Sequence, residues 1–159
     1  MLGHRVRLDT VLGKQKYLST QGCRALFFPP VASCQLTDTS VPSVLVEAEK
    51  SALALVALCS RSERKMLPIA LGGVWGWKRR NGSQLQPDGS RKPTTGPSPS
   101  LDLVAWRGRK AILAFDSNVD GRSNLEKARR ALAEELTKRG ANVFIANVPR
   151  GKGINARMT

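Results

Sequence analysis

The chain has 159 residues and carries 26 Lys and Arg against 12 Asp and Glu, which gives a formal net charge of +14. This length fits one domain of roughly 100–150 residues and excludes a large multidomain machine. Apolar residues make up 41% of the chain, which excludes disorder along its whole length. No apolar run approaches the roughly 18 residues that a membrane span needs. Three cysteines without a CxxC pair and the lack of a secretory signal lead us to expect a cytoplasmic protein without disulfides or a cysteine zinc site.

The positive charge indicates a polyanionic partner, and nucleic acid, either DNA or RNA, is the first candidate. The charge is uneven, because residues 1–50 carry a net +2 whereas residues 51–100 and 101–159 carry a net +6 each. The alternative is a solvated basic surface without a partner. We expect no contact with membranes.

The first half of the chain predicts short strands and one helix. Residues 17–19 and 25–28 are typical of short strands, and residues 43–46 of a buried strand that ends at Glu47. Strong helix formers then predict a helix over residues 49–59. A second apolar run at residues 67–71 predicts another strand, and its proline, Pro68, favours a strand end or an edge position.

Residues 81–100 differ from the rest in composition. They include 3 Gly, 4 Pro and 4 Ser but one large apolar residue, Leu85. Such a segment buries too little surface to offset its ordering entropy, so we expect a flexible insertion.

The second half alternates strands and helices. Residues 101–106 predict a short helical turn, residues 111–115 a strand, residues 123–139 a long amphipathic helix and residues 142–146 a last strand. Gly140 stands where a helix C-cap belongs. This alternation is typical of a parallel α/β sheet.

Two acidic positions follow apolar strands at the points where ligands gather in such sheets. Glu47 ends the first strand of the sheet, and the segment Asp116–Asp120 follows the strand at residues 111–115. A carboxylate there needs a cation or hydrogen-bond donors, and Mg²⁺ suits a site of a few carboxylates and several waters. Helix capping is the alternative, and we favour it for Asp120 and a metal role for Asp116.

A third candidate site combines glycines, tryptophans and cations between residues 72 and 80. Glycines let the backbone approach a ligand closely, and Trp75 and Trp77 could stack on bases while cations hold phosphates. The alternative is that at least one tryptophan covers the edge of the core. Near the C-terminus, Lys152 lies in a glycine-rich segment that lacks the Walker A pattern. The candidate nucleic-acid contacts are Lys50, Trp75, Trp77, Lys78, Arg79, Arg80 and Lys152.

The order of these motifs resembles the TOPRIM-like domain of unknown function in primase and helicase proteins of phages, plasmids and other mobile elements. The segments that carry this resemblance are Val46–Ala52, Gly72–Trp77, Ala114–Asn118 and Gly151–Asn155. The resemblance implies a compact, TOPRIM-like (Rossmann-like) α/β fold, with a mainly parallel sheet flanked by helices, after a short β-rich N-terminal segment.

The resemblance also implies a magnesium site. Glu47 matches the family's glutamate, which binds the metal and acts as the catalytic residue, and Asp116 matches the first aspartate of its DxD pair. Asn118 stands in place of the second aspartate, and Asp120 is a further candidate ligand. Such a site supports phosphoryl or nucleotidyl transfer on nucleic acids, because a divalent ion neutralises charge at the attacked phosphate.

The departures from the family pattern leave catalysis open. Ala48 replaces a glycine, Asn118 an aspartate, and two acidic positions near the C-terminus read Asn155 and Ala156. We therefore divide the chain into an N-terminal extension (1–42), a TOPRIM-like domain (43–155) interrupted by the insertion at 81–100, and a truncated tail (156–159). A separate helicase or primase subunit is the expected partner. The alternatives are a non-catalytic nucleic-acid-binding remnant and a truncated gene product that has lost metal binding.

Overall fold

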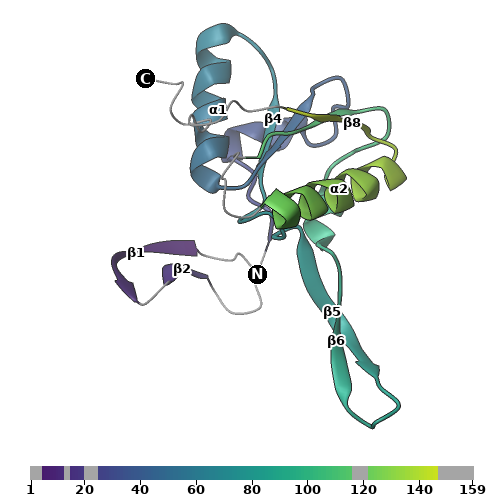
Figure 1. Ribbon diagram of the computed structural model, residues 1–159. Coiled ribbons are helices and arrows are strands. Elements are labelled where there is room, and N and C mark those ends of the chain that lie inside the picture. Colours follow the sequence, from purple (N-terminus) through teal and green to yellow (C-terminus); the bar gives the residue numbers. More distant parts are fainter. Residues whose placement is uncertain (1–4, 13–14, 20–24, 116–121, 147–159) are drawn as a thin grey trace.

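A computed structural model describes residues 5–12, 15–19, 25–115 and 122–146 (Figure 1). The described strands and helices follow one another along the chain as β1 (Arg5–Leu12), β2 (Gln15–Ser19), a 3₁₀ helix (Pro30–Gln35), β3 (Ser43–Val46), α1 (Glu49–Ser62), β4 (Leu67–Ala70), β5 (Lys78–Leu85), β6 (Arg91–Pro97), a second 3₁₀ helix (Pro99–Leu103), β7 (Lys110–Leu113), α2 (Arg122–Lys138) and β8 (Asn142–Ile145).

A four-stranded parallel sheet forms the centre of the fold, with the strand order β4-β3-β7-β8. The protein is therefore an α/β protein with a Rossmann-like sheet, as expected. Pro68 lies on β4, which is an outer strand of this sheet, and this confirms the predicted edge position. Phe27 pairs with Ala70 through two backbone hydrogen bonds of 2.9 Å and covers part of that edge.

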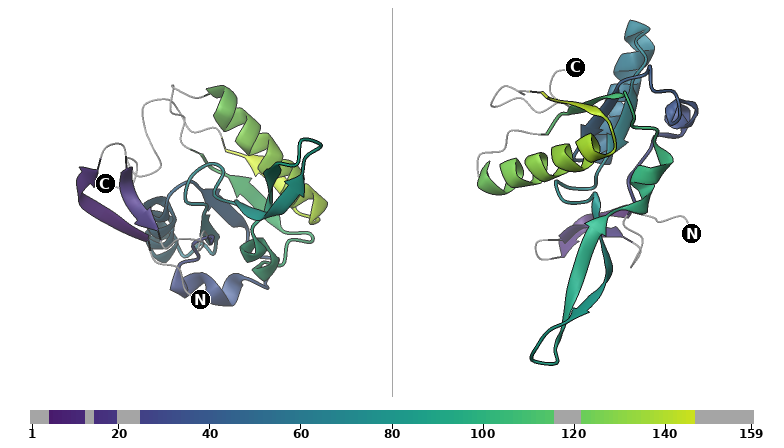
Figure 2. Two further views of the ribbon diagram at one scale, coloured as in Figure 1. Left: turned by 90° about the horizontal axis from the view of Figure 1, so that it is seen from below. Right: turned by 90° about the vertical axis from the view of Figure 1, so that its right-hand side faces the viewer.

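The two helices pack on opposite faces of the sheet because successive strand residues point to opposite sides. Along β3, Leu45 belongs to the core cluster that contains Leu132 and Leu136 of α2. Val44 and Val46 belong instead to the cluster that contains Ala52 and Leu55 of α1. Both faces of β3 are thus covered, which explains why all four of its residues are buried. Figure 2 shows the sheet between the helices from two further directions.

Most of the elements predicted from the sequence are confirmed. The structure has strands at β3, β4, β7 and β8, helices at α1 and α2, and a helical turn at residues 99–103. The N-terminal segment is rich in strand, because β1 and β2 form an antiparallel pair. Gly140 has a φ of 87° just after α2, as a C-cap glycine requires. Residues 25–28 differ from the prediction, since they contribute a single bridge rather than a strand.

Residues 81–100 form regular structure where the sequence led us to expect a loop. Strands β5 and β6 form an antiparallel hairpin that projects from the body of the protein (Figure 1). A turn at residues 86–90 connects them, where the backbone N–H of Gln86 donates to the carbonyl of Ser90. Gly89 has a φ of 80°, a conformation that favours glycine. Composition argued for disorder, but the Asp88-Gly89 pair is a turn signal that predicts a hairpin.

A buried arginine just before β7 joins this strand to residues 35–41 and to Ala105. Arg109 is 0% exposed, and its guanidinium donates to the carbonyl oxygens of Gln35, Leu36, Val41 and Ala105 at 2.8–2.9 Å. Burial lowers the pKa of Arg109, but an arginine remains protonated inside proteins. Its charge is therefore held by backbone dipoles rather than by a carboxylate in contact with it.

Among the described residues, no helix is long and apolar enough to cross a membrane.

Candidate functional site at the carboxyl edge of the sheet

The strand order creates a switch point between β3 and β7. From β3 the chain moves outward to β4 on one side, and then returns to β7 on the other side. In open α/β sheets, ligands bind outside the carboxyl ends of the strands at such a point. The register pairs Leu45 with Leu113, and the N–H of Ala114 donates to the carbonyl of Leu45 at 2.9 Å. Glu47, the first residue after β3, and Phe115, the second residue after β7, therefore leave the sheet side by side.

Glu47 follows β3 directly and lies half-buried at this edge. Its backbone carbonyl accepts a hydrogen bond from the N–H of Gly73 at 2.8 Å, and the carbonyl of Val46 accepts one from Leu71 at 2.9 Å. Helix α1 begins two residues later, with Glu49 in its first turn. The loop that follows β4 thus fixes the backbone on which the Glu47 carboxylate is mounted.

That loop, residues 72–77, is called the glycine loop below, and it folds tightly against the edge of the sheet. Gly72 and Gly73 have φ values of 72° and 111°, which favour glycine. The N–H of Gly76 donates to the carbonyl of Gly73 at 2.9 Å and closes a turn. A Cβ atom at Gly76 would overlap the carbonyl oxygen of Leu71, so a side chain does not fit there. Gly76 therefore allows the loop to pack closely on the backbone of Leu71, whereas the expected close approach of this backbone to a ligand stays a prediction.

Two tryptophans of this loop stack on each other and hold a lysine. Trp75 and Trp77 have ring centroids 6.4 Å apart with planes 26° apart. The Lys78 ammonium lies 4.6 Å from the centroid of the Trp75 ring and 5.0 Å from that of Trp77. Such cation–π contacts fix both the charge and the rings. The Trp75 indole N–H also donates to the side-chain oxygen of Asn124 in the first turn of α2, at 2.9 Å.

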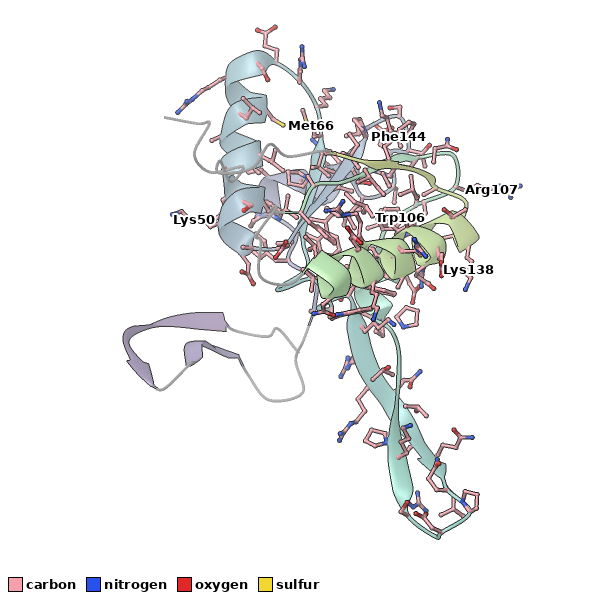
Figure 3. All side chains as sticks on the ribbon, in the orientation of Figure 1. Lys50, Met66, Trp106, Arg107, Lys138 and Phe144 are labelled. Carbon is pink, nitrogen blue, oxygen red and sulfur yellow. The ribbon has the colours of Figure 1, made fainter. Side chains whose placement is uncertain are left out.

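The two tryptophans have different environments. Trp77 is 3% exposed and belongs to the main core, so the core-edge alternative applies to it and its faces are closed to a nucleic-acid base. Trp75 is half-buried at the surface of the loop. Arg79 and Arg80 are exposed at the start of the hairpin, and Lys50 is exposed in the first turn of α1. Figure 3 places Lys50 at the lower end of α1, toward the hairpin, and Met66 toward the opposite end.

The remaining site candidates cannot be placed in the same way. Asp116, Asn118, Asp120 and Lys152 lie outside the described residues. Asp116 is the next residue in the sequence after Phe115. Within the described part of the chain, no group of three or more His, Cys, Asp and Glu side chains is arranged to hold a metal ion. The structure thus brings Glu47, the glycine loop and Trp75 to one edge of the sheet.

The sequence interpretation overlooked residues at this edge and on the hairpin that follows the loop. Asn124 anchors Trp75, and Arg91 and Lys92 add cations to the hairpin. The Asp-Gly turn signal identifies the hairpin and so would have drawn attention to both cations. Asn124 lies 49 residues from Trp75 in the sequence, and no local pattern indicates that contact.

We expect Asn124→Ala to loosen the loop without unfolding the protein. It removes one neutral hydrogen bond at an exposed position, which contributes about 0.5–1.5 kcal/mol to the free energy of unfolding. The tryptophan emission maximum should shift because the environment of Trp75 changes. Asn142→Ala is the matched control, since that side chain is exposed and donates to the carbonyl of Gly108 away from the tryptophans. Equal emission spectra for Asn124→Ala and the unmodified protein would contradict the anchoring role.

Comparison with protein families finds a match over residues 33–157 to the family described as Domain of unknown function (DUF3854). The chain belongs to this family. The matched region contains the whole parallel sheet, both helices, the glycine loop and the hairpin. It begins after the antiparallel pair β1–β2. Comparisons with curated proteins and with solved structures found no match.

Proposed function

We propose that this chain is a TOPRIM-like nucleic-acid-binding domain whose carboxyl sheet edge supports magnesium-dependent phosphoryl or nucleotidyl transfer. The observation that carries the proposal is the position of Glu47 at the switch point, beside the chain that leaves β7. The resemblance to replication proteins of mobile elements and the net charge of +14 support a nucleic-acid substrate. A separate helicase or primase subunit remains the proposed partner.

The donor chemistry at this edge is compatible with magnesium. Glu47 supplies a half-buried carboxylate on a backbone fixed by Gly73, and Asp116 supplies a second carboxylate in the sequence. Proteins bind Mg²⁺ through one or two carboxylates together with several waters, so these two carboxylates are ligands of the right type and number. When bound, the ion would neutralise charge on the phosphate that reacts. Glu47 would hold or accept a proton at its carboxylate, as a general acid–base residue does.

The proposal is tested by magnesium binding. Titration of the protein with MgCl₂, followed by calorimetry and by tryptophan fluorescence, should give a saturable signal. We expect Glu47→Gln and Asp116→Asn to weaken Mg²⁺ binding at least tenfold each, because each removes a charged ligand. Glu134→Gln is the matched control, since Glu134 is an exposed carboxylate on α2, and it should bind like the unmodified protein.

The outcome of this titration also distinguishes the alternative function. Mg²⁺ binding that is absent, or unchanged in both ligand variants, would refute the metal site. Retained binding to nucleic acid would then favour a non-catalytic module, consistent with Ala48 and Asn118 in place of a glycine and an aspartate. Failure of the protein to unfold cooperatively in urea would favour a degraded gene product.

A further inference from the structure

The β5–β6 hairpin is an arm with its own charge and little core. Nearly all of its side chains are exposed along both strands. Residues 78–97 carry five Lys and Arg residues and one Asp. That aspartate, Asp88, accepts hydrogen bonds from the hydroxyl and the backbone N–H of Ser90, which lower the pKa of Asp88 and hold the turn. The net charge of the arm is strongly positive.

The base of the arm is fixed to the core. Trp77 is buried just before β5, and its carbonyl accepts a hydrogen bond from the N–H of Ser98 at 2.7 Å. Ser98 is 1% exposed and its hydroxyl accepts from the N–H of Ser100. The hairpin is therefore held at its base while its strands project into solvent, and Figure 2 shows this projection from the side. Strands of seven to eight residues give a reach of about 25 Å.

The cations occupy both faces of the ribbon and both of its ends. Arg80 pairs with Thr95 near the base, whereas Lys92 pairs with Gln84 and Arg91 with Leu85 near the tip. Because adjacent pairs point to opposite faces, Arg91 and Lys92 lie on different sides. A cation is therefore available wherever the ribbon approaches a charged surface.

The arm lacks the features of a protein-binding surface. Leu85, 67% exposed, is its one large apolar side chain, so neither face is apolar. Pro93 and Pro97 lack the N–H groups that an added strand would need along β6. These features disfavour both burial against a protein and pairing with another sheet edge.

From these observations we propose that the β5–β6 hairpin is a DNA-binding arm that lies in the major groove of a double helix and contacts its phosphates through Arg80, Arg91 and Lys92. The major groove of B-form DNA is about 12 Å wide and admits a two-stranded ribbon, whereas that of duplex RNA is deep and narrow. The inference rests on the proposed nucleic-acid function and names its substrate as double-stranded DNA. The arm leaves the body next to the glycine loop, so it would orient DNA relative to Glu47.

The test compares two triple variants that lose the same charge. In Arg80→Ser/Arg91→Ser/Lys92→Ser the arm loses three exposed cations. In the control, Arg61→Ser/Arg64→Ser/Lys65→Ser, the three exposed cations belong to the last turn of α1 and to the residues between it and Met66, away from the hairpin (Figure 3). Affinity for a labelled 20-base-pair DNA duplex is measured by fluorescence anisotropy at several salt concentrations. All measurements contain EDTA and no magnesium.

We expect the arm variant to bind DNA about tenfold or more weakly, and the control to stay within about threefold of the unmodified protein. The plot of log affinity against log salt concentration should become shallower in the arm variant, with its slope smaller in magnitude by roughly one for each phosphate contact removed. A second variant replaces residues 81–94 by Asn-Gly, which joins the paired residues Arg80 and Thr95 through a two-residue turn. It removes the distal arm without touching the core, and should lose affinity to at least the same extent.

Several results would overturn the inference. These are equal losses in the two triple variants, full affinity in the variant with the shortened arm, equal affinity for duplex RNA, or no binding of duplex DNA by the unmodified protein. The proposed magnesium site is tested independently, because every measurement of DNA binding is made in EDTA and so does not depend on bound metal. A protein that binds no Mg²⁺ but still needs the arm to bind DNA would refute the magnesium site and support the DNA-binding arm.

Discussion

Replacing Arg109 by methionine is expected to lower the free energy of unfolding by about 3–5 kcal/mol. The substitution keeps most of the length of the side chain but removes every donor of the guanidinium. The carbonyl oxygens of Gln35, Val41 and Ala105 would then lose their charged partner in a buried region. Hydrogen bonds to charged groups contribute about 1.5–3 kcal/mol each, and a buried acceptor left unpaired adds its desolvation cost.

Urea denaturation followed by circular dichroism measures this effect, with Arg107→Met as the matched control. Arg107 lies two residues away and is exposed, so its replacement should change the free energy of unfolding by less than about 0.5 kcal/mol. Arg109→Lys should recover part of the loss, because an ammonium keeps the charge but cannot reach four carbonyls from one plane. Equal stabilities of Arg109→Met and Arg107→Met would refute the role of Arg109 in joining the segments.

The parallel sheet could be predicted because its elements carry local patterns. The apolar run at Ser43–Val46 reads as a strand buried on both faces, and that is its environment in the structure. The spacing of Ala128, Leu132 and Leu136 predicts the buried face of α2, and all three residues are 0% exposed. The position of Glu47 at the carboxyl edge followed from the same patterns.

What the sequence did not reveal depends on contacts between distant residues. Arg109 stands in a basic turn, and nothing near it in the sequence distinguishes a buried cation from a solvated one. Its partners Gln35 and Leu36 lie more than 70 residues away. Trp77 likewise resembles Trp75 in its local sequence, although one ring is in the core and the other at the surface. Only tertiary packing separates such pairs.

The hairpin was missed for a different reason. The composition of residues 81–100 is typical of disorder, because it offers almost no apolar surface to bury. The strands form nevertheless, because the turn at Asp88 and Gly89 brings them together and Trp77 and Ser98 hold their base. A ribbon that is anchored at one end can therefore be ordered without a hydrophobic core of its own. Because few side chains of the hairpin are buried, most of them remain available to a charged ligand.

Replacing Gly76 by alanine is expected to destabilise the glycine loop severely, by about 3 kcal/mol or more. The added methyl group would overlap the carbonyl oxygen and carbonyl carbon of Leu71, which are backbone atoms and cannot rotate away. An extra methyl group in a well-packed site typically costs about 1–3 kcal/mol, and an overlap with fixed backbone atoms costs more. Because the turn closed by Gly76 and Gly73 also holds the carbonyl of Glu47, its displacement should weaken Mg²⁺ binding together with stability.

Gly89→Ala is the matched control for the glycine loop. Its Cβ would meet no atom within 4 Å, so the cost is limited to the positive φ of 80°, about 1 kcal/mol. Urea denaturation measures stability, tryptophan fluorescence reports on Trp75 and Trp77, and calorimetry measures the magnesium affinity of both variants. A Gly76→Ala protein with the stability and spectrum of Gly89→Ala would show that the loop can move away from Leu71. Normal magnesium affinity in a destabilised Gly76→Ala protein would separate the loop from the Glu47 site, since the backbone hydrogen bond to Gly73 would then be dispensable for holding that carboxylate.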